Sequence, residues 1–170
     1  MGGERPEAGG AAREAGGERF EVRRRVLFSE TDAAGIVHFS NFFRYFEDAE
    51  HALWRQAGMC IHQGKSPIGW PRVSASCEYH RALRFEEEFD VSVAIAEMTK
   101  RSIRYEGTIT RNGERIASGS WKIACVNRLP DGSMKSTDIP TDVAERLEPF
   151  ASRTSPLAPR ASSSAPRNSI

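Results

Sequence analysis

The chain has 170 residues, of which 39% are hydrophobic, so it can bury one sizeable core. Its 24 lysine and arginine residues nearly balance 23 acidic ones, and the formal net charge of +1 excludes an overall preference for nucleic acid or an anionic membrane surface. No apolar run has the length of a signal peptide or a membrane-spanning helix, which predicts a soluble, cytoplasmic protein.

Both ends of the chain differ in composition from its middle. Residues 1–18 hold six of the 14 glycines, and residues 151–170 are rich in serine and proline. Such segments have too little apolar surface to offset chain entropy, so we predict a disordered N-terminal arm and a disordered C-terminal tail. No repeat or linker divides residues 19–150, which we predict to form one domain.

The domain begins with a predicted strand and a long predicted helix. Apolar and polar side chains alternate over residues 19–29, which is typical of a strand, and a glycine-containing turn follows at 30–37. Ser40 and Asn41 are both good N-caps, and the helix that starts there stops at Gly58. The apolar residues of this helix form one stripe: Phe42, Phe46, Ala49, Leu53 and Ala57.

The opposite face of the predicted helix carries charged residues: Glu47, Asp48, Glu50 and Arg55. We therefore expect this face to be solvated while the apolar stripe packs on a sheet. We interpret Glu47 and Glu50 as solvated surface residues.

Four more strands and a short helix complete the predicted domain. The strands cover 72–82, 88–98, 102–111 and 115–127, and the pair Asn112-Gly113 predicts a hairpin between the last two. A short helix is predicted over residues 140–150. This order indicates an α+β domain in which one helix lies across a five-stranded antiparallel sheet. The uncovered face or the edges of this sheet favour self-association.

The stretch from Phe28 to Glu47, FSETDAAGIVHFSNFFRYFE, places a carboxylate in a turn shortly before a helix. Free N–H groups at a helix N-terminus can hold a developing oxyanion, and a fixed carboxylate can attack a carbonyl or activate water. Hydrolysis of an activated ester needs both. The alternative is that Asp32 is an ordinary turn residue, which bonds the backbone of Ala34.

The string TDAAGIVHFSN, followed by F-x-R-Y-F-E-x-A, resembles the signature of the 4-hydroxybenzoyl-CoA thioesterase family and of bacterial acyl-CoA thioesterases. The resemblance implies the hotdog fold over residues 19–150, with a curved five-stranded antiparallel sheet wrapped around the long helix. It also implies a homodimer or homotetramer that hydrolyses acyl-CoA to free acid and CoA without a cofactor.

The resemblance also assigns roles to single residues. Asp32 matches the catalytic nucleophile or general base, the Phe39 backbone amide matches the donor to the thioester oxygen, and Gly35 matches the glycine of the turn. Asn41 matches an asparagine that caps the helix or positions the carbonyl or water. His38 replaces an aromatic residue of the relatives, and its imidazole could bond the substrate or cap the helix.

Coenzyme A carries phosphates, which a protein without a P-loop usually binds with arginine and lysine. Lys100 and Arg101 match a basic pair of the resembled family, with Arg72 and Arg128 as secondary candidates. The alternative interpretation of Lys100 and Arg101 is an ordinary charged hairpin turn.

Other chemistries find little support in the sequence. The cysteines and the remaining histidines have no metal-ligand spacing, and we expect the cysteines to be reduced; these residues are Cys60, Cys77, Cys125, His51, His62 and His80. There is no G-x-S-x-G nucleophile motif. Two alternatives to a thioesterase stay open: a non-catalytic hotdog protein that binds acyl-CoA or acyl-carrier-protein ligands, and a hotdog hydratase that uses Asp32 with His38.

Overall fold

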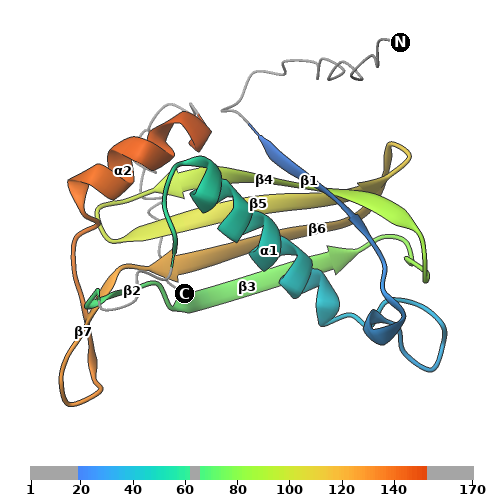
Figure 1. Cartoon of the computed structure of the whole chain (residues 1–170), viewed down its shortest axis with the longest axis horizontal. Coiled ribbons are helices and arrows are strands. Elements are labelled where there is room, and N and C mark those ends of the chain that lie inside the picture. Colours follow the sequence, from blue (N-terminus) through green and yellow to red (C-terminus); the bar gives the residue numbers. More distant parts are fainter. Residues whose placement is uncertain (1–18, 62–65, 153–170) are drawn as a thin grey trace, which may run out of the picture.

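A five-stranded antiparallel sheet forms the centre of the protein, with strands in the order β1-β4-β5-β6-β3 (Figure 1). The computed structural model describes residues 19–61 and 66–152, so the predicted arm 1–18 lies outside the described residues. The strands are β1 (Phe20–Arg25), β3 (Arg72–Tyr79), β4 (Glu88–Met98), β5 (Ser102–Arg111) and β6 (Glu114–Ala124).

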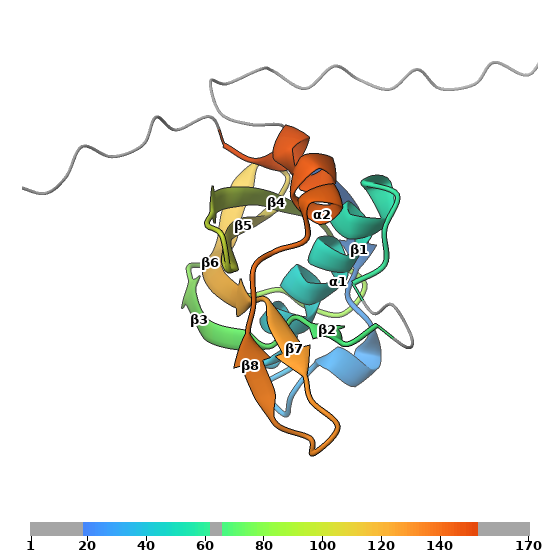
Figure 2. The same cartoon turned by 90° about the vertical axis from the view of Figure 1, so that its left-hand side faces the viewer.

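The helix α1 (Asn41–Gln56) crosses one face of the sheet, which curves around it (Figure 2). The helix ends where predicted, because Gly58 takes a φ of 73° and lets the Met59 N–H reach the Trp54 carbonyl at 2.9 Å. The buried side chains of α1 are Phe42, Tyr45, Phe46, Ala49, Glu50, Leu53 and Trp54.

Two paired glycines let α1 approach the sheet closely. Gly107 on β5 lies opposite Gly119 on β6, and the Phe46 ring sits over both. A Cβ added at either glycine would lie 2.6 Å from a carbon of this ring. The glycine pair therefore sets how deeply the middle of α1 docks on the sheet.

The predicted ends of two strands are wrong. The first strand stops at Arg25 and is followed by the 3-10 helix η1 (Phe28–Glu30). The last breaks at the buried Cys125, whose N–H donates to the Arg101 carbonyl at 2.8 Å. Beyond this break a second, small sheet forms, which the sequence analysis missed: β2 (Ile68–Gly69), β7 (Val126–Arg128) and β8 (Met134–Ser136).

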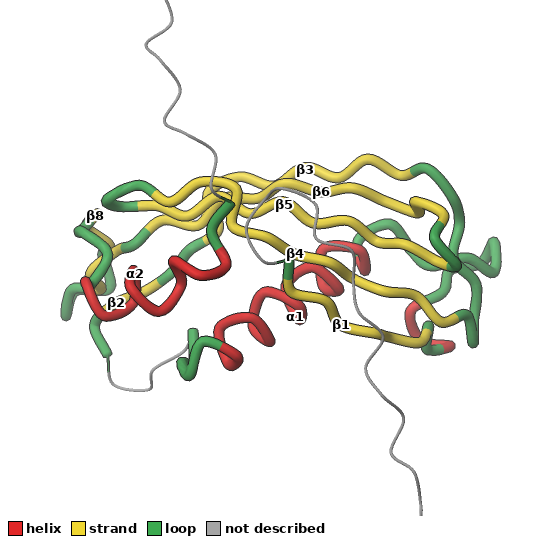
Figure 3. Tube along the Cα trace, turned by 90° about the horizontal axis from the view of Figure 1, so that it is seen from above, coloured by secondary structure: helices red, strands yellow, loops and turns green. Residues whose placement is uncertain are grey.

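The predicted hairpin and C-terminal helix are confirmed. Asn112 and Gly113 have φ values of 53° and 79°, as the tight turn between β5 and β6 requires. The helix α2 (Thr141–Leu147) continues into the 3-10 helix η2 (Glu148–Phe150). Figure 3 shows α1 and α2 on the same face of the sheet, which agrees with the predicted α+β class.

The folded chain extends two residues past the predicted boundary at 150. Ala151 forms a parallel bridge with Ile95, and the Ser152 N–H donates to the Ile95 carbonyl at 2.8 Å. The rest of the predicted tail, residues 153–170, lies outside the described residues. Within residues 19–61 and 66–152, no helix is long and apolar enough to cross a bilayer.

Candidate active site

The candidate carboxylate lies in a closed loop between β1 and α1 (Figure 1). Thr31 and Val37 form an antiparallel bridge at the base of this loop. Beyond it, the Asp32 N–H donates to the Ile36 carbonyl and the Gly35 N–H to the Asp32 carbonyl, both at 2.9 Å. Gly35 has a φ of 71°, which a glycine adopts without strain, so the turn is well defined.

The two oxygens of the Asp32 carboxylate have different surroundings. Oδ1 accepts the Ala34 N–H at 2.8 Å, so Asp32 does make the local turn bond that the sequence analysis named as an alternative. No residue in the described part of the chain donates to Oδ2. Because the side chain is only half-buried, one oxygen orients the carboxylate while the other can reach a ligand.

The backbone N–H of Phe39 lies just before α1, between two peptides whose hydrogen bonds are defined. The His38 N–H donates to the Glu30 carbonyl at 2.9 Å, and the Asn41 N–H donates to the His38 carbonyl at 2.9 Å. The Ser40 N–H points at His38 Nδ1 from 3.4 Å. The Phe39 N–H has no acceptor among residues 19–61 and 66–152, so it can donate to a ligand next to the positive end of the helix.

Glu30 holds this loop against α1, a role that the sequence analysis missed. Its Oε2 accepts the Leu27 N–H and the Tyr45 hydroxyl, both at 2.8 Å, and Arg24 Nη2 lies 3.6 Å from its Oε1. Burial, followed by the hydrogen bond to Glu30, raises the pKa of Tyr45 above its ordinary value, so its hydroxyl keeps the proton that it donates. Glu30 is therefore a fixed anchor for the turn that follows.

The structure changes the interpretation of two predicted site residues. The predicted cap at Asn41 is wrong: Ser40 is the N-cap without a side-chain bond, and Asn41 Nδ2 donates to the Glu30 carbonyl at 2.7 Å. His38 Nδ1 lies 2.8 Å from Ser40 Oγ, and its ring lies against the Phe39 ring with 4.4 Å between centroids. His38 thus contacts the residues at the helix start, and both of its predicted roles stay predictions.

The edge strand β3 also contacts the helix start. The Tyr79 hydroxyl donates to the Phe39 carbonyl at 3.2 Å, and its ring packs edge-on against Phe42 at 5.1 Å. This contact fixes the peptide that follows the free Phe39 N–H. No motif in the sequence pointed to Tyr79, because the contact joins residues 40 positions apart.

The predicted phosphate-binding pair lies at the other end of the sheet. Lys100 and Arg101 form the β4–β5 turn, whereas Glu88 at the start of β4 pairs with Arg25 beside the candidate loop. The 11 residues of β4 span roughly 35 Å. Within one protomer the basic pair therefore does not meet Asp32. Arg101 Nε instead forms an ion pair with Oδ1 of the exposed Asp138, 2.7 Å away.

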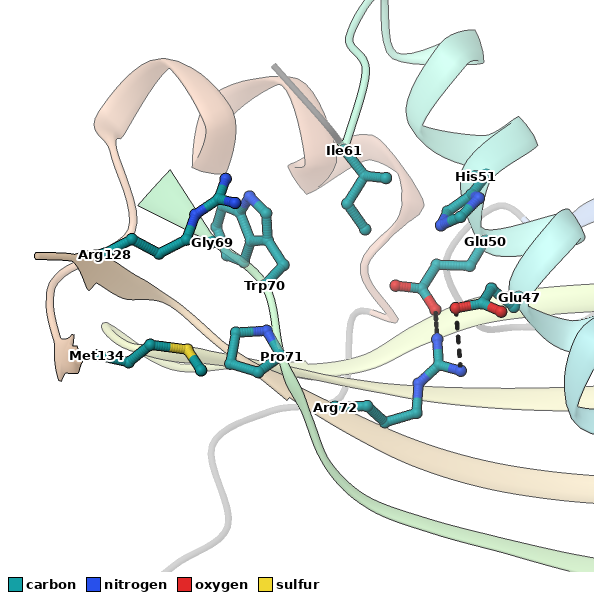
Figure 4. A pocket seen from close by; sticks show the side chains of 10 residues that line it. All are labelled: Glu47, Glu50, His51, Ile61, Gly69, Trp70, Pro71, Arg72, Arg128 and Met134. Atoms are coloured by element: carbon teal, nitrogen blue, oxygen red, sulfur yellow. Dashed lines mark hydrogen bonds and ion pairs between the residues drawn. The ribbon is translucent and has the colours of Figure 1, made fainter. Parts of the chain in front are cut away.

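The described part of the chain contains a pocket of about 460 Å³ between α1 and the small sheet (Figure 4). None of the predicted catalytic residues lines it, although both secondary arginines do; its lining residues are Glu47, Glu50, His51, Ile61, Gly69, Trp70, Pro71, Arg72, Arg128 and Met134. We give the loop before α1 more weight as a catalytic site, because it combines a free amide with a carboxylate.

The expectation that Glu50 is solvated is wrong. Its side chain is fully buried, because Arg72 from β3 and Trp121 from β6 each donate to Oε2 at 2.6 Å. Glu47 is exposed, as predicted. Arg72 is therefore paired with a carboxylate, and Arg128 Nη2 donates to the Ile68 carbonyl at 3.1 Å, while a role of either arginine in phosphate binding stays a prediction.

The cysteines and histidines form no common site in the described residues. Cys60, Cys77 and Cys125 are free, and His80 Nε2 lies 3.1 Å from Ser118 Oγ. His51 lines the pocket, and His62 lies outside the described residues. No group of histidine, cysteine, aspartate or glutamate in residues 19–61 and 66–152 could hold a metal ion.

Comparison with known proteins places this geometry in a family. The model of the thioesterase-like superfamily matches residues 26–147. A solved structure from Aquifex aeolicus is 32% identical with a TM-score of 0.69, covering 75% of this chain and 98% of that one. The structure of a gentisyl-coenzyme A thioesterase is 28% identical with a TM-score of 0.67, and the covered shares are again 75% and 98%.

An acyl-CoA thioesterase of Haemophilus influenzae, YbgC, is 23% identical over 126 residues, which cover 73% of this chain and 90% of that protein. The family match includes the loop of Asp32, all of α1 and most of the sheet. The chain therefore belongs to the thioesterase-like superfamily and has the hotdog fold that its sequence motif implied.

Proposed function

We propose that the protein hydrolyses acyl-CoA thioesters to the free acid and CoA, with Asp32 as the catalytic carboxylate. The observation that carries this proposal is the unpaired Phe39 N–H at the start of α1, in the same loop as the free Asp32 oxygen. The family supports thioester hydrolysis, and the names of the two thioesterase relatives support a CoA ester as substrate.

In the proposed mechanism the thioester oxygen accepts the Phe39 N–H. The oxygen gains negative charge as the carbonyl carbon becomes tetrahedral, so a donor at the positive end of α1 stabilises the transition state more than the substrate. The bonds from the Tyr79 hydroxyl and from the His38 N–H hold the peptides on both sides of this donor.

Asp32 supplies the second part of the chemistry through Oδ2. In one route this oxygen attacks the carbonyl carbon, and the C–S bond breaks to give a mixed anhydride and CoA thiolate; water then cleaves the anhydride. In the other route Oδ2 takes a proton from water, and this water attacks the carbonyl carbon while the thiolate leaves. A thiolate needs no strong general acid to leave, so one carboxylate suffices in both routes.

We further propose that the site is completed by a second copy of the chain. Within residues 19–61 and 66–152 the strand β3 pairs with β6 alone, and Val73 and Tyr79 on β3 are 56% and 45% exposed. An exposed edge strand is a template for pairing with another chain. We expect β3 to pair antiparallel with the same strand of a second protomer, giving a homodimer or a dimer of dimers.

Such pairing would bring opposite ends of two sheets together. Tyr79, at one end of β3, contacts the helix start, whereas Arg72, at the other end, lies near the β4–β5 turn through the strand order β3-β6-β5. A two-fold axis through the middle of β3 therefore places the Lys100–Arg101 turn of the second copy near the Asp32 end of the first. This arrangement would let the basic pair bind the phosphates of CoA.

The experiment is a thiol-release assay on a panel of aryl-CoA, aliphatic acyl-CoA and acyl-carrier-protein thioesters, with wild type and Asp32→Asn. We expect turnover by the wild type on at least one class and a loss of at least about 100-fold in the variant, the scale for a missing base or nucleophile. Equal rates would remove Asp32 from the mechanism. Retained CoA binding with no turnover in either protein would indicate the non-catalytic alternative.

A further inference from the structure

Ser40 stands at the N-cap of α1, but its hydroxyl does not cap the helix. A serine at this position ordinarily accepts a backbone N–H of the first helical turn. Here the side chain makes no cap hydrogen bond, and Ser40 Oγ lies 2.8 Å from His38 Nδ1 instead. Ser40 is exposed and His38 is half-buried, so the hydroxyl is open to a ligand while the loop holds the imidazole.

The contacts of His38 Nδ1 show which group of the pair donates. The Ser40 backbone N–H also points at Nδ1, from 3.4 Å, and an N–H can only donate. Nδ1 is therefore an acceptor, so the neutral ring carries its proton on Nε2 and the Ser40 hydroxyl donates to Nδ1. This is the direction in which a general base removes the proton of a serine nucleophile.

Both members of the pair are fixed by contacts outside it. The His38 N–H donates to the Glu30 carbonyl at 2.9 Å, and the imidazole lies against the Phe39 ring with 4.4 Å between centroids. The peptide that joins Phe39 to Ser40 is held by the Tyr79 hydroxyl, which donates to the Phe39 carbonyl at 3.2 Å. A nucleophile and a base that are already in place need little ordering when a substrate arrives.

The residue between the two, Phe39, supplies a hydrogen-bond donor. Its N–H has no acceptor among residues 19–61 and 66–152. A carbonyl oxygen that accepts this N–H brings its carbon close to the Ser40 side chain, because the two groups belong to adjacent residues. The negative charge that develops on this oxygen during attack by Ser40 would then be stabilised.

A second histidine–serine pair in the described part of the chain provides a contrast. His80 Nε2 lies 3.1 Å from Ser118 Oγ. Ser118 lies within β6, however, where it is paired with Thr108 of β5 on one side and Glu78 of β3 on the other. The backbone there belongs to the sheet ladder, so this pair has the nucleophile and the base without a free donor beside them.

The pair at Ser40 can supply a proton that Asp32 cannot. A thiolate leaves a carbonyl carbon unaided, whereas the oxygen of an alcohol or phenol is a poorer leaving group and gains from protonation as the C–O bond breaks. A carboxylate only accepts. An imidazole that has taken the proton of Ser40 can pass it to the leaving oxygen, so this pair suits oxygen esters.

We infer that Ser40 and His38 form a second catalytic pair, which hydrolyses carboxylic oxygen esters through an acyl-Ser40 intermediate. Ser40 Oγ attacks the carbonyl carbon, its proton moves to His38 Nδ1, and the oxyanion accepts the Phe39 N–H. The C–O bond to the alcohol then breaks, and Nδ1 gives the proton to the leaving oxygen. Water next gives a proton to Nδ1 and attacks the acyl carbon; the C–Oγ bond breaks, Oγ takes the proton, and the free acid leaves.

The test measures phenol release from phenyl acetate, phenyl butyrate and phenyl benzoate by the full chain. We expect the wild type to hydrolyse at least one of the three. Ser40→Ala removes the nucleophile, and His38→Phe keeps a ring against Phe39 but removes the base, so each should lower kcat/KM at least about 100-fold. Ser118→Ala, the matched control from the second pair, should change it less than about 2-fold.

A covalent label shows where the nucleophile is. Diethyl p-nitrophenyl phosphate leaves a stable diethylphosphoryl group on an activated serine hydroxyl, which peptide mass spectrometry locates. We expect the label on Ser40 and not on Ser118, and labelling at least about 100-fold slower in His38→Phe. If His38→Phe fails to fold, Ser40→Ala decides, because its exposed side chain makes no cap bond; its unfolding midpoint is measured alongside.

Thiol release from CoA esters, measured on the same samples, separates this inference from the proposed thioesterase. We expect Ser40→Ala to lower thiol release less than about 10-fold, far less than ester hydrolysis. A wild type that hydrolyses phenyl esters but no CoA ester would refute the proposed function and support the pair. The inference is overturned by a wild type inactive on all three phenyl esters, by a label absent from Ser40, or by equal losses of both activities in Ser40→Ala.

Discussion

Replacing Gly107 by alanine tests how α1 is docked on the sheet. The new Cβ would lie 2.6 Å from Cδ1 and Cε1 of Phe46 and 3.0 Å from Cζ3 of Trp121. Carbon atoms in contact prefer about 3.5–4.0 Å, so the ring or the strand must move by about 1 Å. The Phe46 ring cannot move easily, because it is buried and stacked on Trp121 with 5.1 Å between centroids.

Overpacking of this kind typically lowers the free energy of unfolding by about 1–3 kcal/mol. Alanine restricts the unfolded chain more than glycine does, which offsets about 0.5–1 kcal/mol. We therefore expect Gly107→Ala to destabilise the protein by about 1–2 kcal/mol. Because the same contact sets the depth of α1, we also expect activity to fall in parallel.

The assay is urea unfolding at equilibrium, in the wild-type background and in a Phe46→Leu background. Leucine lacks the ring carbons that the new Cβ meets, so the effect of Gly107→Ala should fall below about 0.5 kcal/mol there. Gly119→Ala, on the partner strand, should behave like Gly107→Ala, because its Cβ would lie 2.6 Å from Cε2 of the same ring. An unchanged midpoint in the wild-type background, or equal effects in both backgrounds, would refute the reasoning.

Three further predictions concern the loop, the buried carboxylate and the basic turn. Glu30→Ala removes the acceptor of the Tyr45 hydroxyl, so we expect steady-state kinetics to give a kcat about 10-fold lower with little change in KM. Burial raises the pKa of Glu50 from 4.5 to about 7. Protonation of Glu50 therefore contributes about 3 kcal/mol to the free energy of unfolding below about pH 4.5, and this contribution is lost as the pH rises through about 7. Urea unfolding at several pH values should show this loss in the wild type but not in Glu50→Gln. Replacing Lys100 and Arg101 by alanine should raise KM for CoA esters about 10-fold, whereas the matching thioesters that lack the nucleotide should be unaffected.

The sequence predicted those parts of the fold that depend on local patterns. The apolar stripe of α1 and the positive φ values at Gly58 and Asn112 follow from nearest neighbours along the chain. The small sheet did not, because β2 has two residues and β7 and β8 have three each, which is too short for a visible alternation. Cys125 ends β6 through a bond to Arg101, a contact that no local pattern records.

The candidate site was predictable where a motif carries it and not where distant residues meet. Asp32 and Phe39 were named from the loop motif, and their catalytic roles stay predictions. Glu50 was misjudged because Glu47, Asp48 and Arg55 on the same predicted face suggested a solvated surface, whereas Arg72 from a different element pairs with Glu50.

The most direct test of the central claim is single-turnover thiol release by three proteins at equal concentration: wild type, Asp32→Asn and Asp131→Asn. Asp131 is a matched control, because its Oδ1 accepts the backbone N–H two residues on, at 2.9 Å from Ser133, as Asp32 does from Ala34. We predict a loss of at least about 100-fold in Asp32→Asn and less than about 2-fold in Asp131→Asn. Equal rates in Asp32→Asn and wild type would contradict the account.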